Sequence, residues 1–264
     1  MTEPVREPHH VQSLERGLAV IRAFDAQHPE LTLSEVARIC DLTRAAARRF
    51  LLTLADLGYV RTDGRMFSLT PRVLELGYAF LSSLSLPEVA APHLERLVAE
   101  LHESSSVSVL DGDDIVYVAR VPTSRIMTVA INVGTRFPAY ATSMGRVLIA
   151  HQADDVVDAY LNRVKLSRLT SRTVLTVPAL ATELRKVRAQ GYAIVDQELE
   201  EGLRSIAAPI HDGTGAVVAA ANVSVQASRT STDVMRRRLL PPLLAATARI
   251  DADLRITAPR RRAL

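Results

Sequence analysis

Five arginines lie close together between residues 44 and 65, and their chemistry suits the binding of anions. A guanidinium group stays charged at physiological pH and donates hydrogen bonds in a planar fork, which matches a phosphate group or the edge of a guanine base. Arg44 and Arg48 are four residues apart, so they would share one face of a helix. The segment can therefore present several cations on one surface. The five are Arg44, Arg48, Arg49, Arg61 and Arg65.

These arginines lie within a pattern of two helices joined by a tight turn. Thr32 and Glu35 form a capping box that predicts the start of the first helix. Asp41 falls in the turn, and Thr43 can cap the second helix, which Gly58 ends. Apolar residues recur at helical spacing along the second helix and must face inward, which leaves its outer face to the arginines. The inward residues are Ala47, Phe50, Leu51, Leu54 and Leu57.

A short basic hairpin follows the second helix. Residues 59–62 and 65–69 alternate as two strands should, and Asp63–Gly64 between them predicts a type I′ turn. Arg61 and Arg65 flank this turn. A capped helix, a turn, an arginine-bearing helix and a basic hairpin are together typical of a winged-helix domain, which lays its second helix in the DNA major groove. We expect DNA contacts from Thr43, Arg44, Ala45, Arg48, Arg49, Arg61 and Arg65.

The alternative interpretation is an ordinary three-helix domain with solvated arginines, and bulk charge does not exclude it. The chain has 32 basic and 29 acidic residues, a net charge of +3, and residues 1–84 contain ten arginines and ten carboxylates. Affinity for double-stranded DNA must then come from where the arginines lie rather than from net charge. Because each chain makes few phosphate contacts, we expect at least a dimer on a palindromic operator.

Length and composition favour two domains and a cytoplasmic location. A chain of 264 residues, 48% of them hydrophobic, can bury two cores. It has no run of eighteen apolar residues, so we expect no membrane span. The segment MTEPVREPHH lacks the apolar stretch of a signal peptide. A single cysteine, Cys40, excludes an internal disulfide and fits a reducing compartment.

Prolines, turns and charge runs predict the domain boundaries. We expect a disordered tail over residues 1–10, a winged-helix domain over 11–69, a linker helix over 70–86, a second domain over 87–257 and a basic tail over 258–264. The second domain has the pattern of an antiparallel sheet with segregated helices, so the fold class is α+β.

The expected elements of the second domain are short and well separated. Strands are expected over residues 106–110, 115–120, 125–131, 192–195, 205–211 and 216–225. Helices are expected over residues 87–102, 142–150, 154–162, 178–190 and 232–255.

Two further helices are expected in the N-terminal half. The first would begin at a cap residue, Ser13, and bury an apolar face. That face consists of Leu14, Leu18, Ile21 and Phe24. The linker helix would open at Thr70 and Pro71, and its apolar residues cover too wide an arc for a solvated helix, which favours a dimer contact. They are Val73, Leu74, Leu76, Tyr78, Phe80, Leu81 and Leu84.

Three blocks of the sequence resemble the IclR-type bacterial transcriptional regulators. The first joins VQSLERGLAVIRAF to LTLSEVARICDLTRAAARRFLLTLADLGYV, the second is FPAYATSMGRVLIA, and the third is GYAIVDQELEEGLRSIAAPIHDGTGAVVAAANVSV. The resemblance extends over residues 11 to about 255. It implies a winged helix, a linker helix and a GAF-like effector-binding domain, assembled as homodimers or dimers of dimers. TRAAARRFL and YATSMGRVL resemble the branch that controls the β-ketoadipate pathway, through which bacteria degrade protocatechuate and para-hydroxybenzoate.

The resemblance implies an effector pocket on one face of the sheet. Such a pocket is apolar with a few placed polar groups. The amides of residues 143–145 begin a helix and could bind a carboxylate, while Ser205, Asn222 and Ser224 could converge from adjacent strands. The alternative is that these residues are small only for sheet packing. The implied residues are Ile126, Val129, Phe137, Ser143, Met144, Gly145, Val195, Leu203, Ser205, Asn222 and Ser224.

Val195 departs from the family signature, which usually has an acidic or polar residue there. An apolar wall disfavours a short hydroxy- or oxo-acid and favours a ring, so we expect a small aromatic or aromatic-derived carboxylate. Arg125, Arg146 and Arg204 are secondary candidates for its carboxylate, although each could equally be a surface arginine. Glu198 matches the signature and is expected to hold its loop by hydrogen bonds, within an otherwise solvated acidic run.

The sequence offers little support for an enzyme. Ser143 lacks the G-x-S-x-G context of a hydrolase nucleophile, and no phosphate-binding glycine motif is present. His93 and His102 are nine residues apart, which does not pair them as metal ligands on one helix face. We expect no catalytic residue, metal or cofactor. The alternatives that remain are a small-molecule enzyme with an accessory helical domain, or an IclR-type regulator of another carboxylic-acid pathway.

Overall fold

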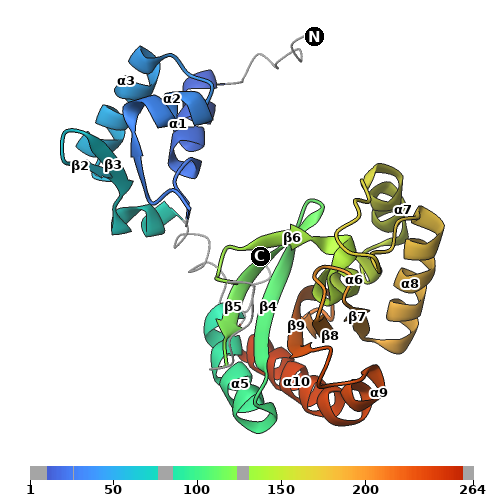
Figure 1. Ribbon diagram of the computed structural model, residues 1–264. Coiled ribbons are helices and arrows are strands. Elements are labelled where there is room, and N and C mark those ends of the chain that lie inside the picture. Colours follow the sequence, from blue (N-terminus) through green and yellow to red (C-terminus); the bar gives the residue numbers. More distant parts are fainter. Residues whose placement is uncertain (1–10, 26, 77–85, 124–130, 258–264) are drawn as a thin grey trace, which may run out of the picture. The chain divides into compact units, whose positions relative to one another are not determined.

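A computed structural model describes residues 11–25, 27–76, 86–123 and 131–257 of the chain (Figure 1). The chain forms two compact units, Met1–Ser83 and Leu84–Leu264. Within the described residues, none of the helices combines the length and apolar character needed to cross a bilayer.

The N-terminal unit packs three helices against a small antiparallel sheet (Figure 1). The helices are α1 (Gln12–Arg22), α2 (Leu33–Ile39) and α3 (Arg44–Asp56). The strands are β1 (Glu30–Thr32), β2 (Val60–Thr62) and β3 (Met66–Leu69), in the order β1-β3-β2. The core is made by Val20, Ala23, Phe24, Leu31, Val36, Ala37, Ala47, Leu51, Leu54, Val60 and Phe67. The winged helix-turn-helix arrangement is therefore confirmed, with β1 as an additional strand.

The expected signals of the helix-turn-helix are confirmed in atomic detail. The N–H of Thr32 donates to Glu35 Oε2 at 2.7 Å, and the N–H of Glu35 donates back to Thr32 Oγ1 at 3.3 Å. Thr43 Oγ1 accepts a hydrogen bond from the N–H of Ala46 at 3.2 Å and so caps α3. Asp41 takes a positive φ of 50° in the turn, a conformation that Asp tolerates better than most residues.

The turn of the hairpin differs from the expected type I′ turn. That turn requires a positive φ at two consecutive residues, but Asp63 is absent from the described residues with positive φ, whereas Gly64 has a φ of 97°. The carboxylate of Asp63 instead accepts hydrogen bonds from the N–H groups of Arg65 and Met66, at 2.9 and 2.7 Å. Each strand is also one residue shorter than expected, and Arg65, which would have opened β3, donates its N–H to the Asp63 carboxylate instead.

The first helix turns a different face to the core than its sequence suggested. Ser13 does not cap it, because the cap position is Val11, which makes no side-chain cap hydrogen bond. Leu14 and Leu18 are 62% and 44% exposed, whereas Phe24 is buried as expected. A Cβ added at Gly17 would lie 3.9 Å from the ring of Phe50, an ordinary packing distance, so α1 runs close to α3 here. Val20, Ala23 and Phe24 enter the core instead, so the stripe of leucines faces away from it.

Only the start of the expected linker helix lies within the described residues. It begins with a 3-10 turn, η1 (Pro71–Val73), in which Thr70 Oγ1 accepts a hydrogen bond from the N–H of Arg72 at 3.2 Å. Leu74 and Leu76 are exposed. The remaining apolar residues expected on this helix, Tyr78, Phe80, Leu81 and Leu84, lie outside the described residues, as do the two expected tails.

The C-terminal unit is built on one antiparallel sheet with the strand order β6-β5-β4-β9-β8-β7. The strands are β4 (Ser104–Asp111), β5 (Asp114–Val121), β6 (Arg136–Pro138), β7 (Ala193–Asp196), β8 (Leu203–His211) and β9 (Val217–Gln226). This confirms the α+β class. Most of the expected strand 125–131 lies outside the described residues, and the pairing partner of β5 is β6, which the sequence pattern did not indicate.

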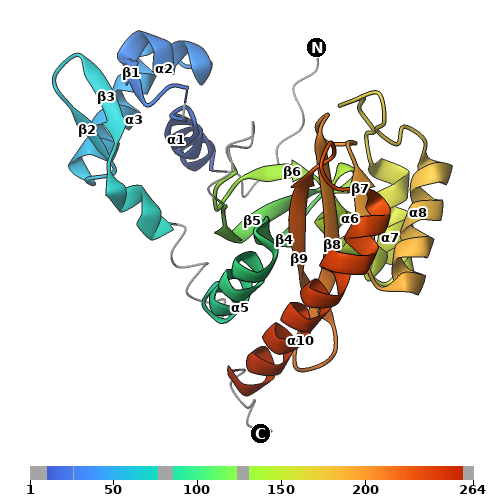
Figure 2. The same cartoon turned by 60° about the horizontal axis from the view of Figure 1, so that its bottom comes forward.

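Helices cover both faces of this sheet (Figures 1 and 2). On one face α5 (Leu86–Leu101) and α10 (Leu240–Thr257) pack together. On the other face α6 (Ser143–Ala150) lies directly against the strands, with α7 (Asp154–Arg163) and α8 (Val177–Gln190) outside it. Each face has its own apolar core, so side chains that alternate along a strand enter different cores.

The last expected helix, over residues 232–255, is interrupted. A short α9 (Thr232–Val234) passes into a π-helical turn, η3 (Met235–Leu239), before α10 begins. Pro241 and Pro242 have no N–H, so the carbonyl groups of Arg237 and Arg238 lack their usual partners four residues later. The widened turn accommodates this loss of two hydrogen bonds.

The capping box makes the stability of the N-terminal unit depend on pH. The pKa of Glu35 is lowered from 4.5, chiefly by the N–H of Thr32. Its carboxylate therefore stabilises the fold above pH 4.5 and loses this contribution as the pH falls through the lowered pKa. We expect the Glu35→Gln variant to have a lower melting temperature than the wild type at neutral pH. In acid the two melting temperatures should converge. Glu30→Gln, outside the box, is the control; a gap that is independent of pH would contradict this account.

Candidate functional site

The surface of α3 presents the arginines as the sequence predicted. Arg44, Arg48 and Arg49 are exposed, while Ala47 and Leu51 on the opposite side are buried in the core. Among the described residues, no carboxylate forms a salt bridge with any of these three arginines. Thr43 and Ala45 are also exposed at the start of the helix. The face is thus a set of cations available to an external anion.

The hairpin adds two exposed arginines to this unit. Arg61 Nε donates to Ser68 Oγ at 3.0 Å, which orients its side chain across β2 and β3. Arg65 lies at the tip beside Asp63. The pKa of Asp63 is lowered, first by the N–H of Met66 and then by that of Arg65. The carboxylate is therefore committed to the backbone of the tip, which stiffens the hairpin that carries the arginines.

In the C-terminal unit a small cavity lies between α6 and the sheet. Its volume is about 20 Å³, room for about one water molecule. The lining residues are Tyr117, Ile131, Ala141, Thr142, Ser143, Met144, Val195, Leu199, Leu203, Ser205, Asn222 and Ser224. The structure therefore brings together seven residues expected in the effector site: Ser143, Met144, Val195, Leu203, Ser205, Asn222 and Ser224.

The register of the strands explains why these side chains meet. Val195 is opposite Ser205 in β7 and β8, and Ser205 is opposite Ser224 in β8 and β9. Residues directly opposite each other share a face of the sheet. A row of side chains therefore runs across three strands beneath α6, and Asn222 adds the next row on the same face because its position differs from that of Ser224 by two.

Hydrogen bonds join the polar lining residues to each other and to the helix. Ser143 Oγ donates to Ser205 Oγ at 2.9 Å. Asn222 Nδ2 donates to Ser224 Oγ at 3.1 Å, and Asn222 Oδ1 accepts from the N–H of Ser106 at 3.1 Å. These groups are buried, and each has a partner, so their interactions offset the cost of burial.

Two of the expected effector residues do not line the cavity, and two others cannot be compared with it. Ile126 and Val129 lie outside the described residues. Phe137 packs its ring edge-to-face on Tyr117, with 5.9 Å between the ring centroids, rather than lining the cavity. Gly145 does not line it either, because it faces the turn that precedes α6.

The start of α6 offers fewer free amides than expected. Thr142 Oγ1 accepts a hydrogen bond from the N–H of Gly145 at 3.0 Å, so this amide is already satisfied. The amides of Ser143 and Met144 remain at the first turn, where an α-helix has no intrahelical acceptor for them. Thr142 was missed as a cap because the sequence analysis placed it inside the helix.

Gly145 has a packing role instead. A Cβ at this position would lie 2.2 Å from the carbonyl oxygen and 2.5 Å from the Cα of Ala139. Ala139 belongs to a 3-10 turn, η2 (Ala139–Ala141), which therefore approaches the helix backbone in a way that only glycine permits. This close approach fixes where α6 begins above the sheet.

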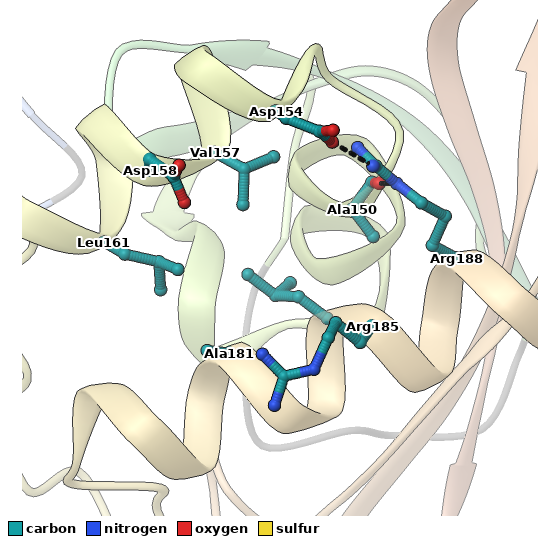
Figure 3. A pocket seen from close by; sticks show the side chains of 9 residues that line it. Ala150, Asp154, Val157, Asp158, Leu161, Ala181, Arg185 and Arg188 are labelled. Atoms are coloured by element: carbon teal, nitrogen blue, oxygen red, sulfur yellow. Dashed lines mark hydrogen bonds and ion pairs between the residues drawn. The ribbon is translucent and has the colours of Figure 1, made fainter.

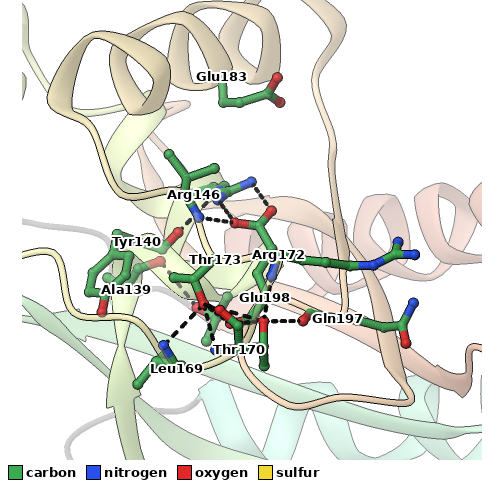
Figure 4. Close-up of polar contacts among 12 residues, drawn as sticks. Ala139, Tyr140, Arg146, Leu169, Thr170, Arg172, Thr173, Glu183, Gln197 and Glu198 are labelled. Carbon is green, nitrogen blue, oxygen red and sulfur yellow. Dashed lines mark hydrogen bonds and ion pairs between the residues drawn. The ribbon is translucent and has the colours of Figure 1, made fainter.

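A buried ion pair anchors the other side of α6 (Figure 4). Arg146 is 2% exposed and donates from Nη1 and Nη2 to the two carboxylate oxygens of Glu198, at 2.8 and 2.5 Å. Arg146 Nε also donates to the carbonyl oxygen of Tyr140 at 2.9 Å. Arg146 is therefore not a surface arginine, and its guanidinium is already paired with a carboxylate of the protein itself. The pairing is bidentate, the geometry that best compensates burial of two charges.

The loop that carries Glu198 is held by further hydrogen bonds (Figure 4). Thr173 Oγ1 donates to the carbonyl oxygen of Glu198 at 2.8 Å, and Thr170 Oγ1 donates to that of Gln197 at 2.7 Å. The N–H of Val174 donates to Glu198 Oε2 at 3.1 Å. The expectation that Glu198 holds its loop is confirmed. The expectation of an otherwise solvated acidic run is wrong for Asp196, whose carboxylate binds two arginines.

Arg204 is also not positioned to bind an effector. It is opposite Asp196 in β7 and Val225 in β9, on the face of the sheet away from Ser205. Its guanidinium binds the Asp196 carboxylate. Although burial opposes it, this pairing lowers the pKa of Asp196. Arg125 lies outside the described residues, so none of the three arginines considered from the sequence is seen at the cavity.

Tyr117 is the main lining residue that the sequence analysis missed. It is 4% exposed, and burial raises the pKa of its hydroxyl to about 12. The hydroxyl therefore stays protonated at physiological pH and can donate a hydrogen bond. The alternation of DIVYVARV placed Tyr117 in a strand, but it does not reveal which face of that strand receives the cavity.

A larger hollow of about 380 Å³ lies between α7 and α8 (Figure 3). Its lining comes from the helices alone, and none of the expected effector residues contributes to it. Arg188 crosses one end, where it binds the carboxylate of Asp154 and the carbonyl oxygens of Ala150 and Gln152. Arg188 thus binds carbonyl groups at the C-terminal end of α6. The described polar groups of the sheet do not line this hollow.

Comparison with known proteins agrees with both halves of the chain. Residues 13–64 match the IclR helix-turn-helix domain, and residues 78–252 match the bacterial transcriptional regulator IclR C-terminal domain. The Pca regulon regulatory protein of Pseudomonas putida is 48% identical over 242 residues, which cover 91% of this chain and 83% of that protein.

Two solved structures resemble the whole chain. A protein from Rhodococcus sp. RHA1 is 60% identical, with a TM-score of 0.85, and the match covers 93% of this chain and 98% of that one. An IclR homologue from Microbacterium hydrocarbonoxydans, complexed with 4-hydroxybenzoate, is 26% identical with a TM-score of 0.83, covering 93% and 100%.

The close approach at Gly145 makes a direct prediction for stability. Gly145→Ala should destabilise the C-terminal unit by about 1–3 kcal/mol, because the added methyl group must push α6 away from Ala139. Gly213→Ala is a matched control, since the nearest atom to its added Cβ is 3.9 Å away. Chemical denaturation of both variants measures the difference. Equal stabilities for the two variants would rule out the proposed packing role.

Proposed function

The chain belongs to the IclR family of bacterial transcriptional regulators, and we propose that its effector is an aromatic or aromatic-derived carboxylate that binds in the cavity beneath α6. The chain is accordingly a regulator and not an enzyme. In this proposal a ligand in the cavity controls how the arginine-bearing unit binds a DNA operator. The regulated genes encode enzymes that break down aromatic acids, and the protein acts in the cytoplasm.

The composition of the cavity lining is the observation that carries this proposal. The described lining residues are uncharged. Val195, Leu199 and Leu203 make apolar walls, and the polar side chains of β8 and β9 make the floor of the cavity. Such a lining suits a flat apolar body with a few oxygen atoms. The complex of the Microbacterium homologue with 4-hydroxybenzoate supports the same class of ligand, and the similarity to the Pca regulon regulatory protein supports the same class of regulated genes.

The bound effector would use both parts of the lining. Its carboxylate would approach the amides of Ser143 and Met144, where the helix dipole favours negative charge. Its ring would lie against Val195 and Leu203, and Ser205 or the neighbouring polar groups of β9 would meet a hydroxyl. Ile126 and Val129 stay proposed contacts from the segment before Ile131. Phe137 would act through Tyr117, and Gly145 through the position of α6.

The cavity must widen to admit such a ligand. A volume of about 20 Å³ is too small for a benzene ring. Met144 is the lining residue best suited to move, because its unbranched side chain has several rotatable bonds. Its Sδ accepts a hydrogen bond from Ser108 Oγ at 3.3 Å, so displacing it also alters a contact with β4. Binding that requires such a shift can favour one arrangement of the protein over another.

On the DNA side, the geometry favours a palindromic operator read by a homodimer or a dimer of dimers. Three exposed arginines on α3 and two on the hairpin make a small cationic face, although residues 1–84 as a whole carry no net charge. Two such faces would double the phosphate contacts. The exposed leucines of α1, Leu14 and Leu18, and of the linker, Leu74 and Leu76, leave apolar surface for contact between chains.

The DNA-binding face is tested by substituting its arginines. On an operator selected in vitro by the wild-type protein, Arg44→Ala or Arg48→Ala should weaken binding by about 1–3 kcal/mol through loss of a base contact. Arg65→Ala should weaken binding to all DNA sequences about equally. It should also reduce, by about one, the slope of the logarithm of the binding constant against the logarithm of the salt concentration. Arg249→Ala, exposed on α10, is the control. Unchanged gel mobility shifts for an Arg44/Arg48 double variant would refute this orientation.

The effector class is tested by calorimetry on the full chain with benzoate, 4-hydroxybenzoate, protocatechuate, β-ketoadipate and a short oxo-acid. We expect at least one aromatic or aromatic-derived acid to bind. Val195→Asp should reduce its affinity by at least about tenfold, because a carboxylate would be desolvated beside an anionic ligand. Val218→Asp, on an exposed part of β9, is the control. Binding of the oxo-acid alone would assign the chain to another carboxylic-acid pathway.

A further inference from the structure

A band of polar contacts crosses the sheet beneath α6 and continues beyond the cavity. It starts at the bond between Ser143 and Ser205 and resumes in β9, where Asn222 holds Ser224. The N–H of Ser106 in β4 donates to the Asn222 side chain at 3.1 Å. The far end of the band is Arg120 in β5, whose Nη1 donates to Ser106 Oγ at 3.4 Å.

The strand register places Arg120 on the cavity face of the sheet. Arg120 is opposite Ser106, and Ser106 is opposite Asn222, so the three side chains share a face. The next pair along the strands, Val107 and Ala119, enters the opposite core beneath α5 and α10. The assignment of Arg120 to the effector side thus follows from backbone pairing as well as from its own hydrogen bond.

The surroundings of Arg120 leave its charge poorly compensated. The side chain is half-buried, and this burial lowers the pKa of its guanidinium. Among the described residues its hydrogen-bond partner is the neutral hydroxyl of Ser106, at a distance near the limit of a hydrogen bond, and the electrostatic influence of Tyr117 does not outweigh the effect of burial. By contrast, Arg146 and Arg204 in the same unit are each paired with a carboxylate. A half-buried cation without an anion is costly unless a ligand supplies one.

The cavity itself supplies no counter-charge, since its described lining residues are neutral. We propose that Arg120 is a second anchor of the effector site, which binds an anionic oxygen group at the end of the effector remote from α6. This inference rests on the proposed function and refines it. The favoured effector carries an acceptor at each end, and a second carboxylate gains more from Arg120 than a hydroxyl does, because both partners are then charged.

The spacing of the strands fits a ligand of this kind. Arg120 is on β5, and Ser205, which bonds Ser143 at the first anchor, is on β8 with β4 and β9 between them, so roughly 14 Å of sheet separates Arg120 from the α6 end of the site. The arginine side chain spans part of this distance. The remainder suits a benzene ring substituted at opposite positions or an open chain of similar length. A short oxo-acid could reach only one of the two anchors.

The test compares ligands that differ only at the remote end. Calorimetry on the full chain uses benzoate, 4-hydroxybenzoate, terephthalate and adipate with the wild type, Arg120→Met and Arg120→Lys. We expect the wild type to bind terephthalate more tightly than benzoate. Arg120→Met should lower terephthalate affinity about 10- to 100-fold and leave benzoate affinity within about twofold. Arg120→Lys, which keeps the charge, should retain part of the preference for the dicarboxylate.

Matched controls separate binding from folding. Arg136→Met removes an exposed arginine of β6 that pairs with Asp111 and Asp114, away from the cavity, and should leave all four affinities unchanged. Equal losses for every ligand in Arg120→Met would mean a structural role and overturn the inference. So would unchanged terephthalate binding in that variant. If the wild type binds none of the acids in either calorimetric series, the proposed function fails first and this inference with it.

Discussion

The ion pair between Arg146 and Glu198 is the interaction on which the effector-binding unit depends. It joins the helix above the sheet to the loop between β7 and β8, and these are the two structures that enclose the cavity. Burying two charges costs several kcal/mol per ion unless the geometry compensates. Here the fork of Arg146 meets both carboxylate oxygens, and its third nitrogen binds the carbonyl oxygen of Tyr140.

The sequence predicts the helix-turn-helix well because its signals are local. A capping box, a Thr cap and an Asp in the turn act over three or four residues, and all three were found where expected. The errors arise where contacts between elements decide the outcome. Leu14 and Leu18 have the same spacing as core residues, but α1 packs through Val20, Ala23 and Phe24 instead. Likewise, the carboxylate of Asp63 selects a hairpin turn that dihedral preference alone does not favour.

The residues of the candidate effector site also differ in how well the sequence predicts them. The alternation of β-strands is enough to place Ser205, Asn222 and Ser224 on a shared face once the strands are assigned in antiparallel order. The partners of charged residues are not predictable in this manner. Arg146 and Glu198 are 52 residues apart, and only the packing of α6 on the sheet brings them together. The sequence analysis therefore brought together the polar residues of the cavity, but it could not identify Glu198 as the partner of Arg146.

The arrangement of charge separates the residues that hold the cavity together from the residues proposed to contact a ligand. The strong electrostatic interaction is satisfied internally by Arg146 and Glu198, so it holds the walls in position without requiring a ligand. The lining that remains is neutral and is joined by hydrogen bonds between hydroxyl and amide groups, each worth about 0.5–1.5 kcal/mol. Such bonds can be exchanged for bonds to a ligand at little net cost. If the proposed ligand displaces Met144 and the polar side chains below it, the ion pair would keep α6 connected to the loop after β7, and the displacement would then be passed to neighbouring elements.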